Sequence, residues 1–169
     1  MLYFSYGSNM SSKRLQARTP SARFVTVASL SHHDLRFHKR SHDGSSKCDA
    51  FETGDVSHSI IGVVFEIADA EKPILDRYEG LGHGYEKKVV RVSDSHGDSL
   101  ESYTYYANDI DPALAPYHWY HHHVLTGAIE HGLPTEYVSR IECILTMDDP
   151  DAERHAREMA VYEALRTEP

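Results

Sequence analysis

The chain has 169 residues, of which 40% are hydrophobic, with seven Pro and ten Gly. This length and composition predict one globular domain over residues 1–169, with a peripheral helix from about residue 151. The formal net charge is −9, although Met1 to Lys47 holds eight Lys or Arg against two Asp. Because the acidic remainder would repel phosphate, and aromatic residues do not alternate with the basic ones, we expect no nucleic-acid partner.

The sequence contains no sign of a membrane anchor or an export signal. Its longest apolar run, around Ile60 to Phe65, is too short to span a bilayer, and the N-terminus lacks a charged region followed by a long apolar one. Cys48 and Cys143 form no CxxC pair, and we interpret them as an exposed loop thiol and a small core residue. We therefore predict a cytoplasmic protein with no membrane partner.

The N-terminal segment has the pattern of a strand, a turn and a helix. Residues 2–6 form a short aromatic strand that runs into Gly7, Ser8 and Asn9, and residues 11–18 follow as a helix. A second strand is predicted over Arg23 to Leu30. The polar stretch from Ser31 to Lys47 is expected to be a long, mobile surface connection with at most one short strand, near Leu35 to Phe37.

The rest of the chain is predicted to continue with strands and then helices. Ile60 to Ile67 is apolar enough for a central strand, and a short helix runs from about Pro73 to Gly80. Two runs rich in β-forming residues, 85–92 and 100–107, form an antiparallel hairpin. Three further helices are predicted over residues 116–131, 134–145 and 151–165. This order predicts an α+β fold with a mixed or largely antiparallel sheet curled around the core.

The Gly7-Ser8-Asn9 turn is a candidate anion site. A strand that enters a small-residue turn and opens a helix presents several backbone N–H groups in one direction, with the positive end of the helix dipole behind them. Gly7 would let the backbone approach a ligand, Ser8 would add a hydroxyl, and Asn9 would cap the helix or fix the turn. The alternative interpretation is an ordinary capped helix start.

Three motifs in this order resemble the γ-glutamylcyclotransferase family, which includes γ-glutamylamine cyclotransferases and AIG2-like proteins. They are Tyr3-Phe4-Ser5-Tyr6-Gly7-Ser8-Asn9-Met10, Asp76-Arg77-Tyr78-Glu79-Gly80 and Gly132-Leu133-Pro134. The resemblance covers Met1 to about Leu145 and implies a small mixed barrel with helices around it. Glutathione-specific relatives have Leu where this chain has Asn9, so the match is to the broader group.

The resemblance also implies the residues of a substrate pocket. The glutamyl end of the substrate would be bound by Tyr3, Phe4, Ser5, Tyr6, Gly7, Ser8 and Asn9. Tyr85 and Tyr120 match tyrosines that the family places near the substrate, where a phenol can donate a hydrogen bond and its ring can wall the pocket. The expected partner is a small γ-glutamyl compound, and a homodimer is compatible with the sequence.

Glu79 is the candidate catalytic residue. We expect Ile74, Leu75 and Tyr78 to form the apolar face of the short helix, with Glu79 at its edge. Partial burial and the helix C-terminus both disfavour a negative charge, which suits a proton-transfer group, although a solvated Glu before a helix-ending Gly is the alternative. By the resemblance, Glu79 would move a proton from the substrate α-ammonium to the departing amine, with no metal and no cofactor.

A histidine-rich stretch offers a weaker metal hypothesis. Adjacent residues such as His121, His122 and His123 point about 100° apart on a helix and cannot converge on one ion. His118 and His122 share a face, but no HExxH glutamate accompanies them. We therefore expect a solvated helix face that binds metal only adventitiously.

Two rival functions remain open at this point. One is a non-catalytic module that binds a carboxylate or γ-glutamyl ligand in the same pocket, in which Glu79 would not reach the turn. The other is a cyclotransferase acting on a γ-glutamyl amine, or on a γ-glutamyl group attached to a biosynthetic intermediate.

Overall fold

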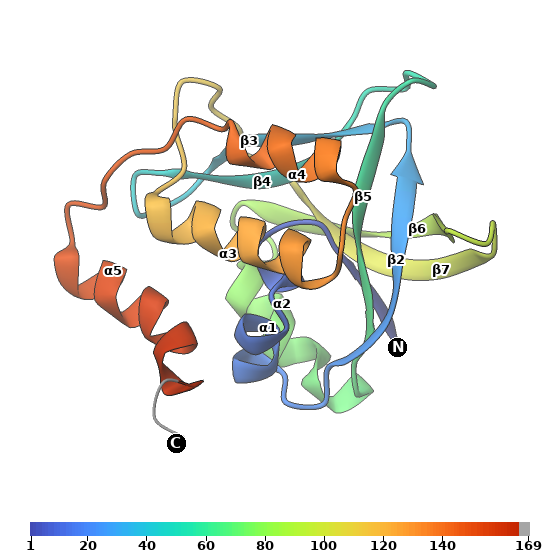
Figure 1. The fold of residues 1–169 in the computed structure, drawn as a ribbon, viewed down its shortest axis with the longest axis horizontal. Helices are drawn as coiled ribbons and strands as arrows, with labels where there is room; N and C mark the ends of the chain where they lie inside the picture. The colour runs from blue at the N-terminus through green and yellow to red at the C-terminus, as the bar shows by residue number, and fades with distance from the viewer. Residues whose placement is uncertain (166–169) are drawn as a thin grey trace.

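A closed five-stranded barrel lies at the centre of the computed structural model, which describes residues 1–165 and their side chains up to residue 162. Its strands follow the order β1-β5-β2-β6-β7 (Figure 1). They are β1 (Leu2–Ser5), β2 (Arg23–Ser31), β5 (Ser59–Glu66), β6 (Tyr85–Asp94) and β7 (Ser99–Ala107). β1 pairs antiparallel with β5 and parallel with β7, and the other pairs are antiparallel. The predicted α+β fold with a mixed, largely antiparallel barrel is confirmed.

The sequence patterns of the strands explain their places in the barrel. β5 carries a nearly continuous apolar run whose residues Val63, Val64 and Phe65 are all buried, as expected for a strand covered on both faces. β6 instead alternates, with Val90 and Val92 buried and the residues beside them exposed or half-buried, because successive side chains point to opposite faces.

Helices surround the barrel as predicted, and all but one of the α-helices are shorter than predicted. The α-helices are α1 (Ser12–Arg18), α2 (Lys72–Glu79), α3 (His118–Glu130), α4 (Thr135–Glu142) and α5 (Ala152–Met159). Short 3₁₀ segments are η1 (Ser8–Met10), η2 (Asp69–Glu71) and η3 (Ala160–Leu165). In Figure 1, α1 and α2 lie next to each other at one end of the barrel, and α5 extends to one side. The last predicted helix is therefore α-helical only in its first half.

The polar stretch from Ser31 to Lys47 is not the mobile connection that we predicted. It contributes a full strand, β3 (His33–Arg40), which pairs antiparallel with β4 (Ser46–Glu52) in a separate two-stranded sheet. The hairpin was missed because several of its inward positions are polar and satisfy one another. His38 Nε2, for example, lies 2.8 Å from Asp49 Oδ2 with both side chains buried. Such pairs hide the apolar alternation on which strand prediction depends.

Both cysteine interpretations are also wrong. Cys48 is 1% exposed, because it belongs to the buried face of β4. Cys143 is exposed at the end of α4. Both errors follow from element boundaries, since the predicted loop ends directly before Cys48 and the predicted helix over residues 134–145 includes Cys143, which lies just after the last residue of α4.

Helix α3 packs directly on the turn that carries the candidate anion site. A Cβ atom added to Gly127 would lie 2.4 Å from the backbone nitrogen of Ser11 and 2.5 Å from Cβ of Met10. These distances are far below van der Waals contact, so only a glycine allows this approach. The backbone of α3 therefore fixes the position of η1.

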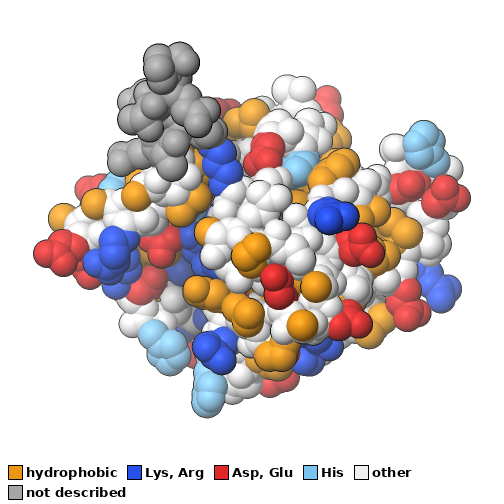
Figure 2. All heavy atoms as spheres, turned by 90° about the horizontal axis from the view of Figure 1, so that it is seen from below, with side chains coloured by type: hydrophobic (Ala, Val, Ile, Leu, Met, Phe, Trp, Pro, Cys, Tyr) orange, Lys and Arg blue, Asp and Glu red, His pale blue; other side chains and the backbone are white. Residues whose placement is uncertain are grey.

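The surface carries charges of both signs. On the face that Figure 2 shows, Lys and Arg side chains are mixed with Asp and Glu side chains, and apolar side chains are scattered among them. None of the helices in residues 1–165 has the length and apolar character needed to cross a membrane.

Candidate functional site

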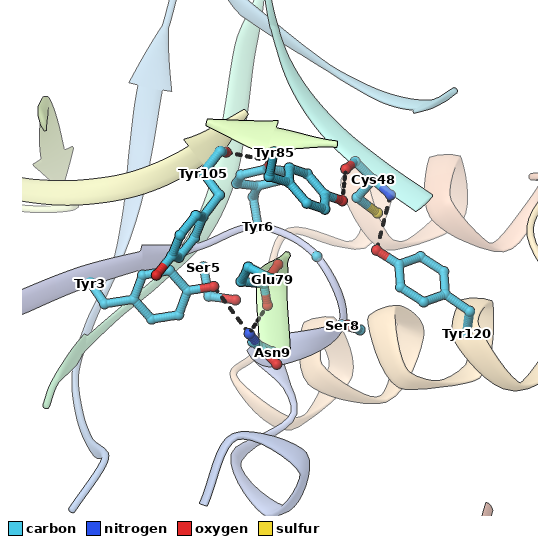
Figure 3. Close-up of a pocket in the computed structure, with 11 residues that line it drawn as sticks. Tyr3, Ser5, Tyr6, Ser8, Asn9, Cys48, Glu79, Tyr85, Tyr105 and Tyr120 are labelled. Carbon is cyan, nitrogen blue, oxygen red and sulfur yellow. Dashed lines mark hydrogen bonds between the residues drawn. The ribbon is translucent and has the colours of Figure 1, made fainter. Parts of the chain in front are cut away.

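A cavity that is partly open to solvent lies where β1 ends, between the turn that follows it and the end of α2 (Figure 3). It is lined by Tyr3, Ser5, Tyr6, Gly7, Ser8, Asn9, Cys48, Glu79, Tyr85, Tyr105 and Tyr120. The structure thus brings together Glu79 and eight of the nine residues predicted to bind substrate. Phe4 is the exception. It is fully buried in the core, because side chains alternate along β1 and its neighbours Tyr3 and Ser5 take the cavity side.

The turn after β1 does not open an α-helix directly, as we had expected. It forms η1 first, and α1 begins only at Ser12. The first hydrogen bond of η1 runs from the Met10 N–H to the Gly7 carbonyl at 2.9 Å. The N–H groups of Ser8 and Asn9 therefore have no acceptor within the helix, as is usual for a first turn. Asn9 does not cap the helix, since its side chain is directed to the end of α2.

Asn9 connects the turn to Glu79. Its Nδ2 donates a hydrogen bond to Glu79 Oε1 at 2.7 Å and lies 3.2 Å from the hydroxyl of Tyr3 (Figure 3). Its Oδ1 accepts from Arg18 at 2.9 Å, which fixes the orientation of the amide. Within the described part of the chain, Oε2 of Glu79 has no hydrogen-bond partner. One carboxylate oxygen is thus held in place while the other is available to a ligand.

The surroundings of Glu79 differ from the predicted apolar face. Of the three residues expected to form it, only Leu75 is buried, while Ile74 is 37% and Tyr78 57% exposed. Arg18 covers the Glu79 carboxylate instead. Its guanidinium stacks on the Tyr78 ring at 4.9 Å and lies 3.5 Å from Glu79 Oε1. The Glu79 side chain is left 15% exposed. Burial lowers the pKa of Arg18, and the Glu79 carboxylate opposes this shift.

Two tyrosines hold the backbone of Cys48 at the far wall of the cavity. The Tyr85 hydroxyl donates to the Cys48 carbonyl at 2.6 Å, and the Cys48 N–H donates to the Tyr120 hydroxyl at 2.9 Å (Figure 3). Burial raises the pKa of both phenols well above their ordinary value, so they stay neutral. Burial also raises the pKa of the Cys48 thiol to about 12, which makes it a poor nucleophile.

Several site residues escaped the sequence analysis. Tyr105 lines the cavity, and its carbonyl accepts a hydrogen bond from the Tyr6 hydroxyl at 2.6 Å. A second cleft shares Glu79 with the cavity and opens beside it. Its basic lining residues are Arg14, Arg18, Lys39 and Lys47. All four belong to the first 47 residues, whose excess of positive charge was the only signal of this cleft in the sequence.

The histidines of α3 do not gather around a common point. His118 lies 2.7 Å from the Thr146 hydroxyl, His121 contacts the Ile141 carbonyl at 2.7 Å, and the ring of His122 meets that of Tyr162 edge-on. Among residues 1–165 there is no cluster of three or more His, Cys, Asp or Glu side chains with a geometry suited to a metal ion.

Comparisons with known proteins agree with this geometry. The model of the AIG2-like family matches residues 59–141. The γ-glutamylcyclotransferase of Homo sapiens is 31% identical over 153 residues, covering 85% of this chain and 78% of the human protein. The bovine enzyme of the same name (Bos taurus) is 32% identical over 152 residues, with the same shares of each chain covered.

Solved structures point to the same family. A structure named γ-glutamyl cyclotransferase superposes with a TM-score of 0.83 at 27% identity, covering 95% of this chain and 98% of that one. The two chains therefore share their fold over nearly their full lengths. The chain belongs to the γ-glutamylcyclotransferase family, which includes the AIG2-like proteins, and is an enzyme of the cyclotransferase type.

Proposed function

We propose that this enzyme releases 5-oxoproline from a γ-glutamyl amino acid, peptide or amine, with Glu79 as the general acid and base. The observation that carries the proposal is the 2.7 Å hydrogen bond by which Asn9 holds one oxygen of Glu79 at the edge of the cavity. This contact also favours catalysis over a non-catalytic binding module, in which Glu79 would not reach the turn. The relatives named γ-glutamylcyclotransferase support the same reaction class.

The reaction is an intramolecular transfer of an acyl group. Glu79 takes a proton from the α-ammonium of the γ-glutamyl unit, and the freed amine attacks the γ-carbonyl carbon of the same unit. A new C–N bond closes the five-membered ring, and the bond from that carbon to the leaving nitrogen breaks. Glu79 then gives this proton to the leaving nitrogen. The ring nitrogen, which carries two hydrogens after the attack, loses one of them through the same carboxylate, and the released amine takes it up as an ammonium. Two protons thus leave the α-nitrogen and two reach the leaving nitrogen, and no water is consumed.

The cavity walls would assist by holding the glutamyl chain in a bent conformation. Good intramolecular geometry of this kind can lower a barrier by about 7–11 kcal/mol. The N–H groups of Ser8 and Asn9, which have no acceptor in η1, would face the α-carboxylate or the oxyanion that develops on the γ-carbonyl. The neutral phenols of the cavity wall would contribute further hydrogen bonds and exclude water.

The proposal is tested by measuring 5-oxoproline release from γ-glutamyl dipeptides, glutathione and γ-glutamyl amines. Release from at least one class, at a rate proportional to enzyme concentration, is the expected result. No release from any compound, combined with measurable binding of one of them, would instead identify a binding module. The panel also separates the candidate substrate classes, including amines.

We further propose that the enzyme works in the cytoplasm, where its two free thiols would stay reduced.

A further inference from the structure

Lys39 is a buried cation without an ionic partner in the described part of the chain. Lys39 is 6% exposed, and its ammonium lies 4.7 Å from the centre of the Tyr85 ring. The other cations of the basic cleft each face a carboxylate: Arg14 pairs with Glu158, Arg18 with Glu79, and Lys47 with Asp43. The lining of the cleft therefore carries one positive charge that the described residues do not neutralise.

The strand pairing places this charge where it is unfavourable for folding. Lys39 lies directly opposite Lys47 in the β3–β4 hairpin, and both residues line the same cleft. Like charges at opposite positions destabilise a sheet. A bulge between Phe37 and Lys39 makes the consecutive residues His38 and Lys39 both buried, and such bulges commonly redirect a side chain at a functional site.

The link between α2 and β6 leaves space for the same ammonium. A Cβ atom added to Gly84 would lie 2.7 Å from Lys39 Cε and 2.8 Å from Lys39 Nζ. Any other residue at this position would displace the lysine from the Tyr85 ring. Burial lowers the pKa of Lys39, and the nearby Glu79 and Asp43 carboxylates oppose this shift. The hairpin and the link thus both shape a place for one cation beside Glu79.

We propose that Lys39 binds an anionic group, such as a carboxylate, on the leaving amine of the substrate. The inference rests on the proposed function, in which Glu79 returns its proton to the leaving nitrogen. The leaving group must then pass Glu79, which borders both the cavity and the basic cleft. With the glutamyl end under the turn, the leaving group extends into the cleft. A carboxylate there neutralises the unpaired ammonium of Lys39 and relieves its repulsion with Lys47.

Two substrates that differ by one carboxylate test this assignment. γ-Glutamylalanine and γ-glutamylethylamine have the same glutamyl unit, and only the first has a carboxylate on its leaving amine. We expect Lys39→Met to lower kcat/KM for γ-glutamylalanine about tenfold or more, the usual scale for a lost hydrogen bond to a charged group, with less than about a twofold change for γ-glutamylethylamine. Lys39→Arg keeps the charge and should retain the preference for γ-glutamylalanine.

Lys88→Met is the matched control. Lys88 also has its ammonium near a tyrosine ring, 5.3 Å from that of Tyr106, but it lies outside the cavity and the basic cleft. Thermal unfolding of each variant separates a specific effect from loss of fold. Equal losses for both substrates in folded Lys39→Met would overturn the proposal, because Lys39 would then serve the glutamyl end. No loss for either substrate would overturn it as well.

A binding measurement keeps this inference separate from the proposed function. If the wild-type chain releases 5-oxoproline from neither compound, the catalytic proposal has failed, and calorimetric affinities for the two compounds still test Lys39. A loss of affinity in Lys39→Met that is confined to γ-glutamylalanine would support the assignment. Undetectable binding, or affinities that change equally, would overturn it.

Discussion

Asn9 and Glu79 are 70 residues apart in the chain, yet the Asn9 amide donates to the Glu79 carboxylate at 2.7 Å. The contact joins the turn after β1 to the last residue of α2. Asn9 is itself oriented by Arg18, whose guanidinium also lies 3.5 Å from the same carboxylate oxygen. The position of the proposed proton-transfer group is therefore set by side chains from the turn and from α1, and both supports can be removed by substitution.

Glu79→Gln should lower turnover by about 10²-fold or more, the usual scale for a positioned proton-transfer group, while ligand affinity and fold are retained. Gln can still accept the hydrogen bond from Asn9 through its carbonyl oxygen, so the geometry is kept and only the proton transfer is lost. The measurement is kcat for 5-oxoproline release, with Glu101→Gln on the exposed side of β7 as the control. Turnover that stays at the wild-type level would remove Glu79 from the mechanism.

Asn9→Asp should lower kcat more than it raises KM. The substitution keeps the size of the side chain but places a carboxylate against Glu79 Oε1, where an amide donor now lies. A lost hydrogen bond to a charged group corresponds to about 1.5–3 kcal/mol, or roughly 10- to 10²-fold in rate, and repulsion adds to this loss. Asn108→Asp is a close control, because Asn108 also donates to a glutamate, Glu86, but on the exposed surface. Equal effects of the two substitutions would argue against a positioning role for Asn9.

The barrel and the centre of the site could be predicted from the sequence because their signals are local. The apolar run of β5 and the alternating hairpin of β6 and β7 show directly in the order of residues. Glu79 and the turn after β1 were found through motifs that resemble those of a family. That Glu79 lies close to this turn follows from the fold of the family, and the comparisons support that fold.

The basic cleft could not be predicted, because its residues depend on partners that are distant in the chain or on irregular pairing. The strand β3 is stabilised by the buried contact of His38 with Asp49, and neither residue is typical of a buried strand. The Lys39 side chain is buried through a bulge, which breaks the period-two pattern. Arg18 similarly covers Glu79 by stacking on Tyr78, a contact between two helices that the pattern of either helix alone cannot show.

Gly127→Ala should lower both stability and activity. The added methyl would lie 2.4 Å from the Ser11 nitrogen and 2.5 Å from Met10, at the end of η1, so either α3 or the turn must shift. Overpacking of this kind typically costs about 1–3 kcal/mol. Because the turn also carries Asn9, we expect kcat/KM to fall even at temperatures where the variant is fully folded.

Gly97→Ala separates these two effects. Gly97 has a φ of +85° in the turn between β6 and β7, and a Cβ added there would meet no atom within 4 Å. This substitution should therefore lower the melting temperature through backbone strain and leave kcat/KM unchanged. If Gly127→Ala lowers only the melting temperature and leaves kcat/KM unchanged, the contact between α3 and η1 does not control catalysis.

His123 connects α3 to the C-terminal region through a buried polar network. Its ring is completely buried, with Nε2 2.9 Å from an Arg14 nitrogen and Nδ1 2.7 Å from the Tyr162 hydroxyl. Arg14 can only donate, so we assign a neutral imidazole whose Nδ1 proton is donated to Tyr162. Burial lowers the pKa of His123 from 6.5 to about 4.

The shift at His123 predicts a loss of stability on acidification between pH 6.5 and about pH 4. In this window the unfolded chain binds a proton on His123 and the folded chain does not, so the free energy of unfolding falls as the pH falls, by at most about 3 kcal/mol from this group. Urea denaturation at pH 7 and pH 5 measures the effect, and His123→Gln should reduce the difference between the two values. His96→Gln, in the exposed turn after β6, should keep the wild-type difference. Equal pH dependence in His123→Gln and the wild type would show that other groups cause the acid sensitivity.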